Sequence, residues 1–322
     1  MNARTQRLSF ASLAVALASL AGGCAGGREG AEATRLYNQG IEASAAGARD
    51  AAYSYFVRAS KLDPENHRAL YEMALIDLYD KRDAYQKGLA ELEMAESIQP
   101  RDRDVLYQLE RAAISHGNHE QGLRYAERAL AEDPNYAPAW YYRGVGYHAL
   151  GQLDQADHAF RETIAIDPTY TPAYRELGAM YEEVDAADAA RKVYEEGLRH
   201  DGDDPDLLNA LGVLALSRGE KEEAVDLLKK AKGYSDGRSD VLFNLAFAYV
   251  EAGDTREAFR NLGEYLNGAD PGDVENIRVA TMLRNTMVEE LRRQRREAEE
   301  KGEPPPPDLP ETPKPGETPD AP

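Results

Sequence analysis

The residues that could do chemistry in this chain are few and scattered. The single cysteine, Cys24, excludes an intrachain disulfide and a cysteine-rich zinc site. His116 and His119 in "HGNH" resemble a metal pair only loosely, and "DGDDPD" at 201–206 lacks the glycine and distal Glu of a calcium-binding EF-hand loop. The chain has no serine nucleophile elbow, phosphate-binding Gly-Lys-Ser/Thr loop or HExxH pair. We therefore expect no enzyme activity, no cofactor and no bound metal.

The cysteine ends a segment that is typical of secretion. Arg4 and Arg7 precede the apolar stretch "LSFASLAVALASL", which is shorter than the about 20 residues that span a bilayer. A positive start, a short apolar middle and a small-residue end predict a signal peptide over residues 1–23.

The end of this signal resembles the lipobox of bacterial lipoproteins, in which small residues precede a cysteine that becomes the lipidated N-terminus. Ala21 stands where the family prefers Leu. The resemblance implies acyl chains on Cys24 that hold the protein to a membrane. Ala25 after the cysteine favours the periplasmic face of the outer membrane. The alternative is an ordinary signal, whose removal would leave a secreted or periplasmic protein with a free thiol.

The charge balance narrows the choice of partners. The chain carries 58 acidic and 38 basic side chains, a formal net charge of −20. This argues against nucleic acid, because phosphate binding needs a positive stripe. It also argues against electrostatic attachment to anionic lipids, so attachment to a membrane would have to be hydrophobic.

Proline recurs along the chain with a regular spacing. The segments "KLDP", "SIQP", "AEDP" and "AIDP" end at Pro64, Pro100, Pro134 and Pro168, at intervals of 36, 34 and 34 residues. Because the residue before a proline disfavours the helical region, each of these segments predicts a helix end. A period near 34 residues indicates a helical repeat.

Residues 137–168 resemble the tetratricopeptide repeat (TPR), a helix–turn–helix unit. The matching positions are Trp140, Gly144, Tyr147, Gly151, Ala156, Phe160 and Pro168. Stepping outward in register gives seven units over residues 33–271. The resemblance implies an all-α, right-handed superhelical solenoid with a C-terminal capping helix, in which small residues such as Gly144 allow the two helices of a unit to cross closely.

In this family the first helices line a concave groove, which their second, fifth, ninth and twelfth positions face. Tyrosine recurs at the fifth position, where its apolar ring and polar tip suit an extended peptide or a helix. The alternative is that some of these rings only pack against the next repeat. The predicted partner-binding residues are Tyr37, Tyr71, Leu75, Tyr107, Arg111, Tyr141, Val145, Arg175 and Phe243.

The remaining segments are short. Residues 24–32 are predicted to be a flexible tether after the lipidated cysteine, and residues 272–301 a capping helix. The proline- and acid-rich residues 302–322 are predicted to be disordered, either as an inert tail or as a ligand for an aromatic groove. "RRQRR" at 292–296 is interpreted as part of a solvated helix rather than a nucleic-acid or lipid patch, because "EAEE" follows at once.

These observations predict a non-catalytic scaffold, lipid-anchored in the bacterial envelope, that binds an envelope protein through its groove. Two alternatives stay open. Tyr-lined grooves also suit sugar rings, so the chain could be a module that binds glycan or peptidoglycan. It could also be a regulatory subunit of an envelope enzyme.

Overall fold

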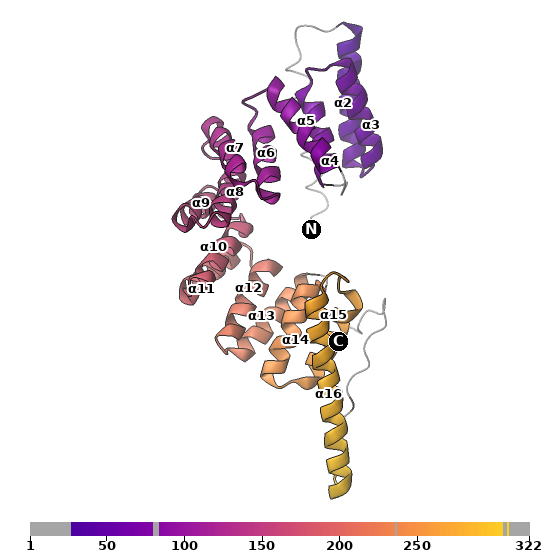
Figure 1. The fold of residues 1–322 in the computed structure, drawn as a ribbon, viewed down its shortest axis with the longest axis vertical. Helices are drawn as coiled ribbons and strands as arrows, with labels where there is room; N and C mark the ends of the chain where they lie inside the picture. The colour runs from indigo at the N-terminus through magenta and orange to yellow at the C-terminus, as the bar shows by residue number, and fades with distance from the viewer. Residues whose placement is uncertain (1–26, 80–83, 236, 305–307, 309–322) are drawn as a thin grey trace, which may run out of the picture. The chain divides into compact units, whose positions relative to one another are not determined.

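The computed structural model describes residues 27–79, 84–235, 237–304 and 308, and every regular element in these ranges is an α-helix (Figure 1). Cys24, the predicted signal segment and most of the proline-rich tail lie outside the described residues. None of the described helices is long and apolar enough to cross a membrane. The helices are α2 (Arg28–Ala45), α3 (Arg49–Leu62), α4 (His67–Tyr79), α5 (Tyr85–Ile98), α6 (Arg103–Ser115), α7 (His119–Glu132), α8 (Ala137–Ala149), α9 (Leu153–Ile166), α10 (Thr171–Glu183), α11 (Ala187–His200), α12 (Pro205–Ser217), α13 (Lys221–Tyr234), α14 (Ser239–Ala252), α15 (Thr255–Gly268) and α16 (Val274–Lys301).

Consecutive helices pack as pairs, each pair followed by the next along the chain. The chain divides into two compact units, Met1–Glu162 and Thr163–Pro322. The first unit contains the pairs α2 with α3, α4 with α5 and α6 with α7, and the second contains α10 with α11, α12 with α13 and α14 with α15. The predicted all-α fold of repeated helix pairs is therefore confirmed.

In most described repeats, the residue that ends the first helix has the left-handed backbone conformation, with positive φ. Gly47, Gly117, Gly151, Gly219 and Gly253 hold this position with φ between 70° and 80°. Glycine adopts positive φ without a Cβ clash, and the amides at and after it can bond back to the last carbonyls of the helix. Asp185 stands at the equivalent place in the repeat formed by α10 and α11, with φ of 57°, so the turn geometry persists without glycine.

The two helices of a repeat approach each other closely at one point. A Cβ atom added to Gly144 in α8 would lie 2.6 Å from Phe160 in α9, and one added to Gly212 in α12 would lie 2.6 Å from Leu228 in α13. Gly40 faces Phe56, and Gly178 faces Tyr194, in the same way. The close crossing predicted at Gly144 is therefore present, and the side chain that fills it is the Phe160 ring.

The third repeat reverses this pairing of small and large residues. Glu110 in α6 occupies the position of those glycines, and Ala126 in α7 occupies the position of the large side chains. Glu110 is fully buried, and neither of its carboxylate oxygens has a hydrogen-bond partner among the described residues. Burial raises the pKa of Glu110 well above its usual value, while the charge of Arg143 acts in the opposite direction.

The first helix of the repeat array begins earlier than predicted, and the last helix packs against the final repeat. Helix α2 begins at Arg28, so residues 28–32, predicted to belong to the tether, are helical; Glu29 in the first turn suits the helix dipole. At the other end, Ile277, Leu283 and Met287 of α16 pack against α14 and α15. In the basic stretch, Arg292 and Arg293 form ion pairs with Glu289 and Glu290 one turn earlier.

Replacing Gly178 by alanine is expected to destabilise the protein by about 1–3 kcal/mol, because the added methyl group would overlap the buried Tyr194 ring. Gly233 in α13 is the matched control, since a Cβ there meets nothing within 4 Å. Gly233→Ala should stabilise by roughly 0.5–1 kcal/mol through helix propensity. Urea unfolding of both variants checks this, and equal effects would contradict the close-crossing account.

Glu110→Met is expected to stabilise the protein at pH 8 by about 1–3 kcal/mol, because it removes a buried polar group without a partner. The pKa of Glu110 is higher in the folded than in the unfolded state, so folding takes up a proton. The stability of the parent should therefore fall as pH rises above the unfolded value, and the advantage of Glu110→Met should grow. Urea unfolding from pH 5 to pH 8 measures this; a pH-independent difference would contradict it.

Candidate protein-binding surface

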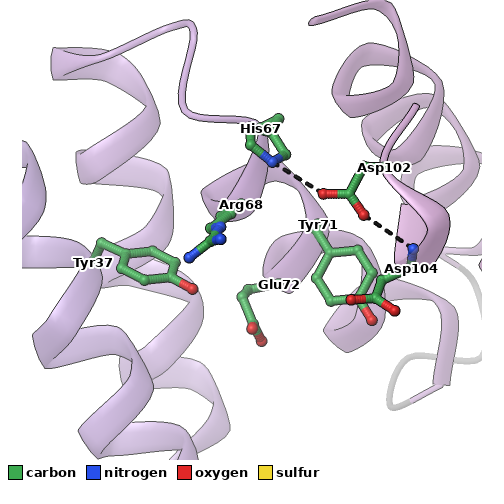
Figure 2. Close-up of a pocket in the computed structure, with 7 residues that line it drawn as sticks. All are labelled: Tyr37, His67, Arg68, Tyr71, Glu72, Asp102 and Asp104. Atoms are coloured by element: carbon green, nitrogen blue, oxygen red, sulfur yellow. Dashed lines mark hydrogen bonds and ion pairs between the residues drawn. The ribbon is translucent and has the colours of Figure 1, made fainter. Parts of the chain in front are cut away.

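A cavity of about 190 Å³ lies on the first helices of the first three repeats (Figure 2). Tyr37 comes from α2, and Asp104 comes from α6. Helix α4 supplies four residues from its first two turns. The complete lining is Tyr37, His67, Arg68, Tyr71, Glu72, Asp102 and Asp104. The cavity therefore brings together the first two of the predicted tyrosines with a set of charged side chains.

Asp102 fixes one wall of the cavity. It is the N-cap of α6, where its carboxylate accepts hydrogen bonds from the amides of Asp104 (3.0 Å) and Val105 (3.2 Å). Its other oxygen lies 3.1 Å from Nε2 of His67. The bond to His67 and the two backbone bonds lower the pKa of Asp102. This side chain thus joins α4 to α6 and is already fully engaged.

The charged side chains of the cavity affect the pKa values of the Tyr37 and Tyr71 hydroxyls. Burial is the largest cause that raises the pKa of both Tyr37 and Tyr71 to about 12. At Tyr71 a hydrogen bond with Gln108 lowers the pKa, and the charges of Asp104, Glu72 and Asp102 raise it. At Tyr37 the charge of Arg68 opposes that of Glu72. Both hydroxyls are therefore neutral at pH 7, and the Tyr71 end of the cavity is the more negative one.

Further aromatic residues extend this surface over α6 and α8. The Tyr107 ring lies 5.5 Å from that of Tyr136 and 5.7 Å from that of Tyr142. The Arg111 guanidinium lies 4.1 Å from the centre of the Tyr79 ring, which is within the range of a cation–π contact. Tyr107 and Arg111 are half-buried and Tyr79 is exposed, so the cluster keeps area for a partner.

The other predicted residues of the first unit contribute less to this surface. Tyr141 is 9% exposed, and its ring packs against Tyr142 and Phe160. It therefore belongs to the core, which corrects its assignment as a contact residue. Leu75 and Val145 are half-buried on α4 and α8.

The predicted residues of the second unit have different surroundings. Arg175 is half-buried and forms ion pairs with Glu176 at 2.7 Å and Asp206 at 3.8 Å. Phe243 is half-buried between Phe247 and Tyr265, at ring distances of 6.3 Å and 5.3 Å. At these two positions the second unit thus presents an apolar ring among other rings and an arginine paired with carboxylates.

Sequence reasoning missed most of the charged lining of the cavity. Arg68 and Asp104 occupy the second position of their repeats, a groove position that we did not assign, so the repeat register could have found them. His67 and Glu72 lie beside the assigned positions on α4. Asp102 lies before α6, at a place that no helix register marks.

The described residues show no metal centre. Within them, no group of three or more His, Cys, Asp or Glu side chains could hold a metal ion. In the "HGNH" segment, His116 stacks on the Tyr85 ring at 3.3 Å, and His119 is the first residue of α7.

Comparison with known families agrees with the repeated helix pairs. Models of the tetratricopeptide repeat match residues 113–181, 185–240 and 240–267. Residues 113–267 of the chain therefore consist of tetratricopeptide repeats.

Known structures and curated proteins resemble parts or most of the chain. A tetratricopeptide repeat protein from Parabacteroides merdae aligns with 80% of this chain and 99% of its own, with a TM-score of 0.61 and 15% identity. PilW, a type IV pilus biogenesis factor, aligns with 65% of this chain and 96% of its own, with a TM-score of 0.58 and 20% identity. At these identities the likeness shows the fold alone.

One curated relative is an enzyme. The probable UDP-N-acetylglucosamine–peptide N-acetylglucosaminyltransferase SPINDLY of Hordeum vulgare is 31% identical over 134 residues, or 40% of this chain. The match spans only 14% of that protein, so it carries no activity over to this chain.

Proposed function

We propose that this protein is a non-catalytic scaffold that holds a partner protein on the first helices of its repeats. The proposed location is the bacterial envelope, with acyl chains on Cys24 as the anchor. The proposal joins the fold, which supports a protein-interaction scaffold, to the cavity on α2, α4 and α6.

The observation that carries the proposal is the composition of the cavity and the adjoining aromatic cluster. Tyr37 and Tyr71 present rings and neutral hydroxyls within one cavity, and Tyr107 and Arg111 continue the surface on α6. Such side chains combine apolar area with hydrogen-bonding tips, as peptide-binding grooves require. Among the charged residues that line the cavity, Asp102 is committed to capping α6 and to His67.

Crosslinking in intact cells followed by capture of the tagged protein tests the scaffold. The double variant Tyr71→Ala/Tyr107→Ala removes two partly exposed rings from the surface and should lose most of the captured partner. Tyr234→Ala is the matched control, because Tyr234 is 53% exposed on α13, a second helix. It should capture the partner as the parent does, and circular dichroism should show all three proteins equally helical.

Other results of that experiment would redirect or overturn the proposal. Equal capture by the double variant and the parent would exclude this surface as the contact. Capture of no protein by the parent, together with binding of the purified protein to peptidoglycan, would favour a glycan-binding module instead.

The anchor is tested separately with Cys24→Ser. We expect the parent to incorporate a radiolabelled fatty acid and to sediment with membranes, because two or more buried acyl chains give stable attachment. Cys24→Ser should lose both properties while the purified protein keeps its helical circular dichroism spectrum. Sedimentation of the variant with membranes as complete as that of the parent would contradict lipid anchoring.

A further inference from the structure

Glu72 is the one carboxylate of the cavity that its surroundings leave uncompensated. Asp102 is bonded to His67 and to two amides, and Asp104 accepts a hydrogen bond from the Tyr136 hydroxyl at 3.2 Å. No hydrogen bond or ion pair joins Glu72 to another described residue. Burial raises the pKa of Glu72, which is the expected result when a charged group loses water without gaining a partner.

The position of Glu72 suits a ligand that enters between two rings. Figure 2 shows its carboxylate between Tyr37 and Tyr71, with Arg68 on the Tyr37 side. The rings of tyrosine attract cations through their faces, and a neighbouring carboxylate strengthens that attraction. Because Asp104 and Asp102 add negative charge at the Tyr71 end, a cation would be favoured beside Tyr71 and repelled by Arg68 at the other end.

The size of the cavity limits what can occupy it. Its volume of about 190 Å³ is many times the roughly 10–15 Å³ that is enough to hold one water molecule. It is smaller than the roughly 300–1,000 Å³ of sites that enclose a small-molecule ligand. One long side chain of a peptide fits this range, with the peptide backbone remaining outside.

We propose that this cavity binds an arginine or lysine side chain from an extended segment of the partner protein. The cation pairs with Glu72 between the rings of Tyr37 and Tyr71, and Arg68 donates to a backbone carbonyl of the segment. This inference rests on the proposed scaffold function and adds the chemistry of the partner. The formal net charge of −20 favours a basic segment at longer range as well.

Isothermal titration calorimetry with capped Gly/Ser peptides tests this inference on the purified protein. One peptide carries several arginines, the second carries citrulline, the uncharged isostere, at the same places, and the third carries glutamate. We expect the arginine peptide to bind about tenfold or more tightly than the citrulline peptide, as for a hydrogen bond to a charged group. About 0.15 M salt limits long-range attraction, because the screening length is then about 8 Å.

Two variants of equal charge separate the cavity from diffuse attraction. Glu72→Gln should reduce the preference for arginine over citrulline to less than about threefold, because it removes the charge inside the cavity. Glu93→Gln, on the exposed face of α5, removes the same charge elsewhere and should keep the full preference. Thermal unfolding of both variants checks that they remain folded.

Several results would overturn the inference. The first is an equal loss of the preference for arginine over citrulline in Glu72→Gln and Glu93→Gln. The second is tighter binding of the glutamate peptide than of the arginine peptide, and the third is that the parent binds none of the peptides. Each would leave the scaffold proposal standing, because that proposal depends on capture of a partner by Tyr71 and Tyr107. Conversely, a failed capture with a preserved preference for arginine would show that the cavity binds cations but that the scaffold proposal is wrong.

Discussion

The close approach of two helices within each repeat is the constraint on which the rest of the structure depends. At Gly144 and its counterparts a ring or a leucine of the second helix fills the space that a missing Cβ leaves on the first. Because this contact fixes the rotation of the first helix, it also decides which side chains remain outside. Tyr37, three residues before Gly40, is held half-buried in this way, beside the Phe56 ring at 5.7 Å.

The third repeat shows that the constraint concerns volume rather than residue type. Here the first helix carries the large side chain, Glu110, and the second helix carries the small one, Ala126. The space at the crossing is therefore filled from the first helix instead of the second. The exchange places a carboxyl group where the other repeats have hydrocarbon, and burial there raises the pKa of Glu110. The same helix carries Asp104 of the cavity and Arg111 of the aromatic cluster, so part of the binding surface lies on a repeat with a buried carboxyl group in its core.

The spacing of about 34 residues predicts the structural features that depend on residues of one repeat alone, such as helix ends and close helix crossings. Gly151 ends a helix, Gly144 marks a close crossing and the Asp-Pro pairs end second helices, because each acts through its own backbone. Asp185 shows that even a glycine position can be filled by another residue. The cavity could be predicted only in part, because Asp102, His67 and Tyr37 come from three repeats. The burial of Tyr141 depends on the neighbouring Tyr142 and Phe160 rings, and no spacing rule contains that information.

Many arginines of this acidic chain form ion pairs between helices. Arg128, Arg191 and Arg218 each reach a carboxylate of an adjacent repeat, and Arg103 and Arg238 each reach one near the other end of the same repeat. Exposed pairs of this kind contribute about 0–1 kcal/mol each, and each arginine offsets the charge of the carboxylate that it contacts. The carboxylates left without partners then determine the surface potential. Glu72 matters among them because it lies inside a cavity, where a charge is screened least by water.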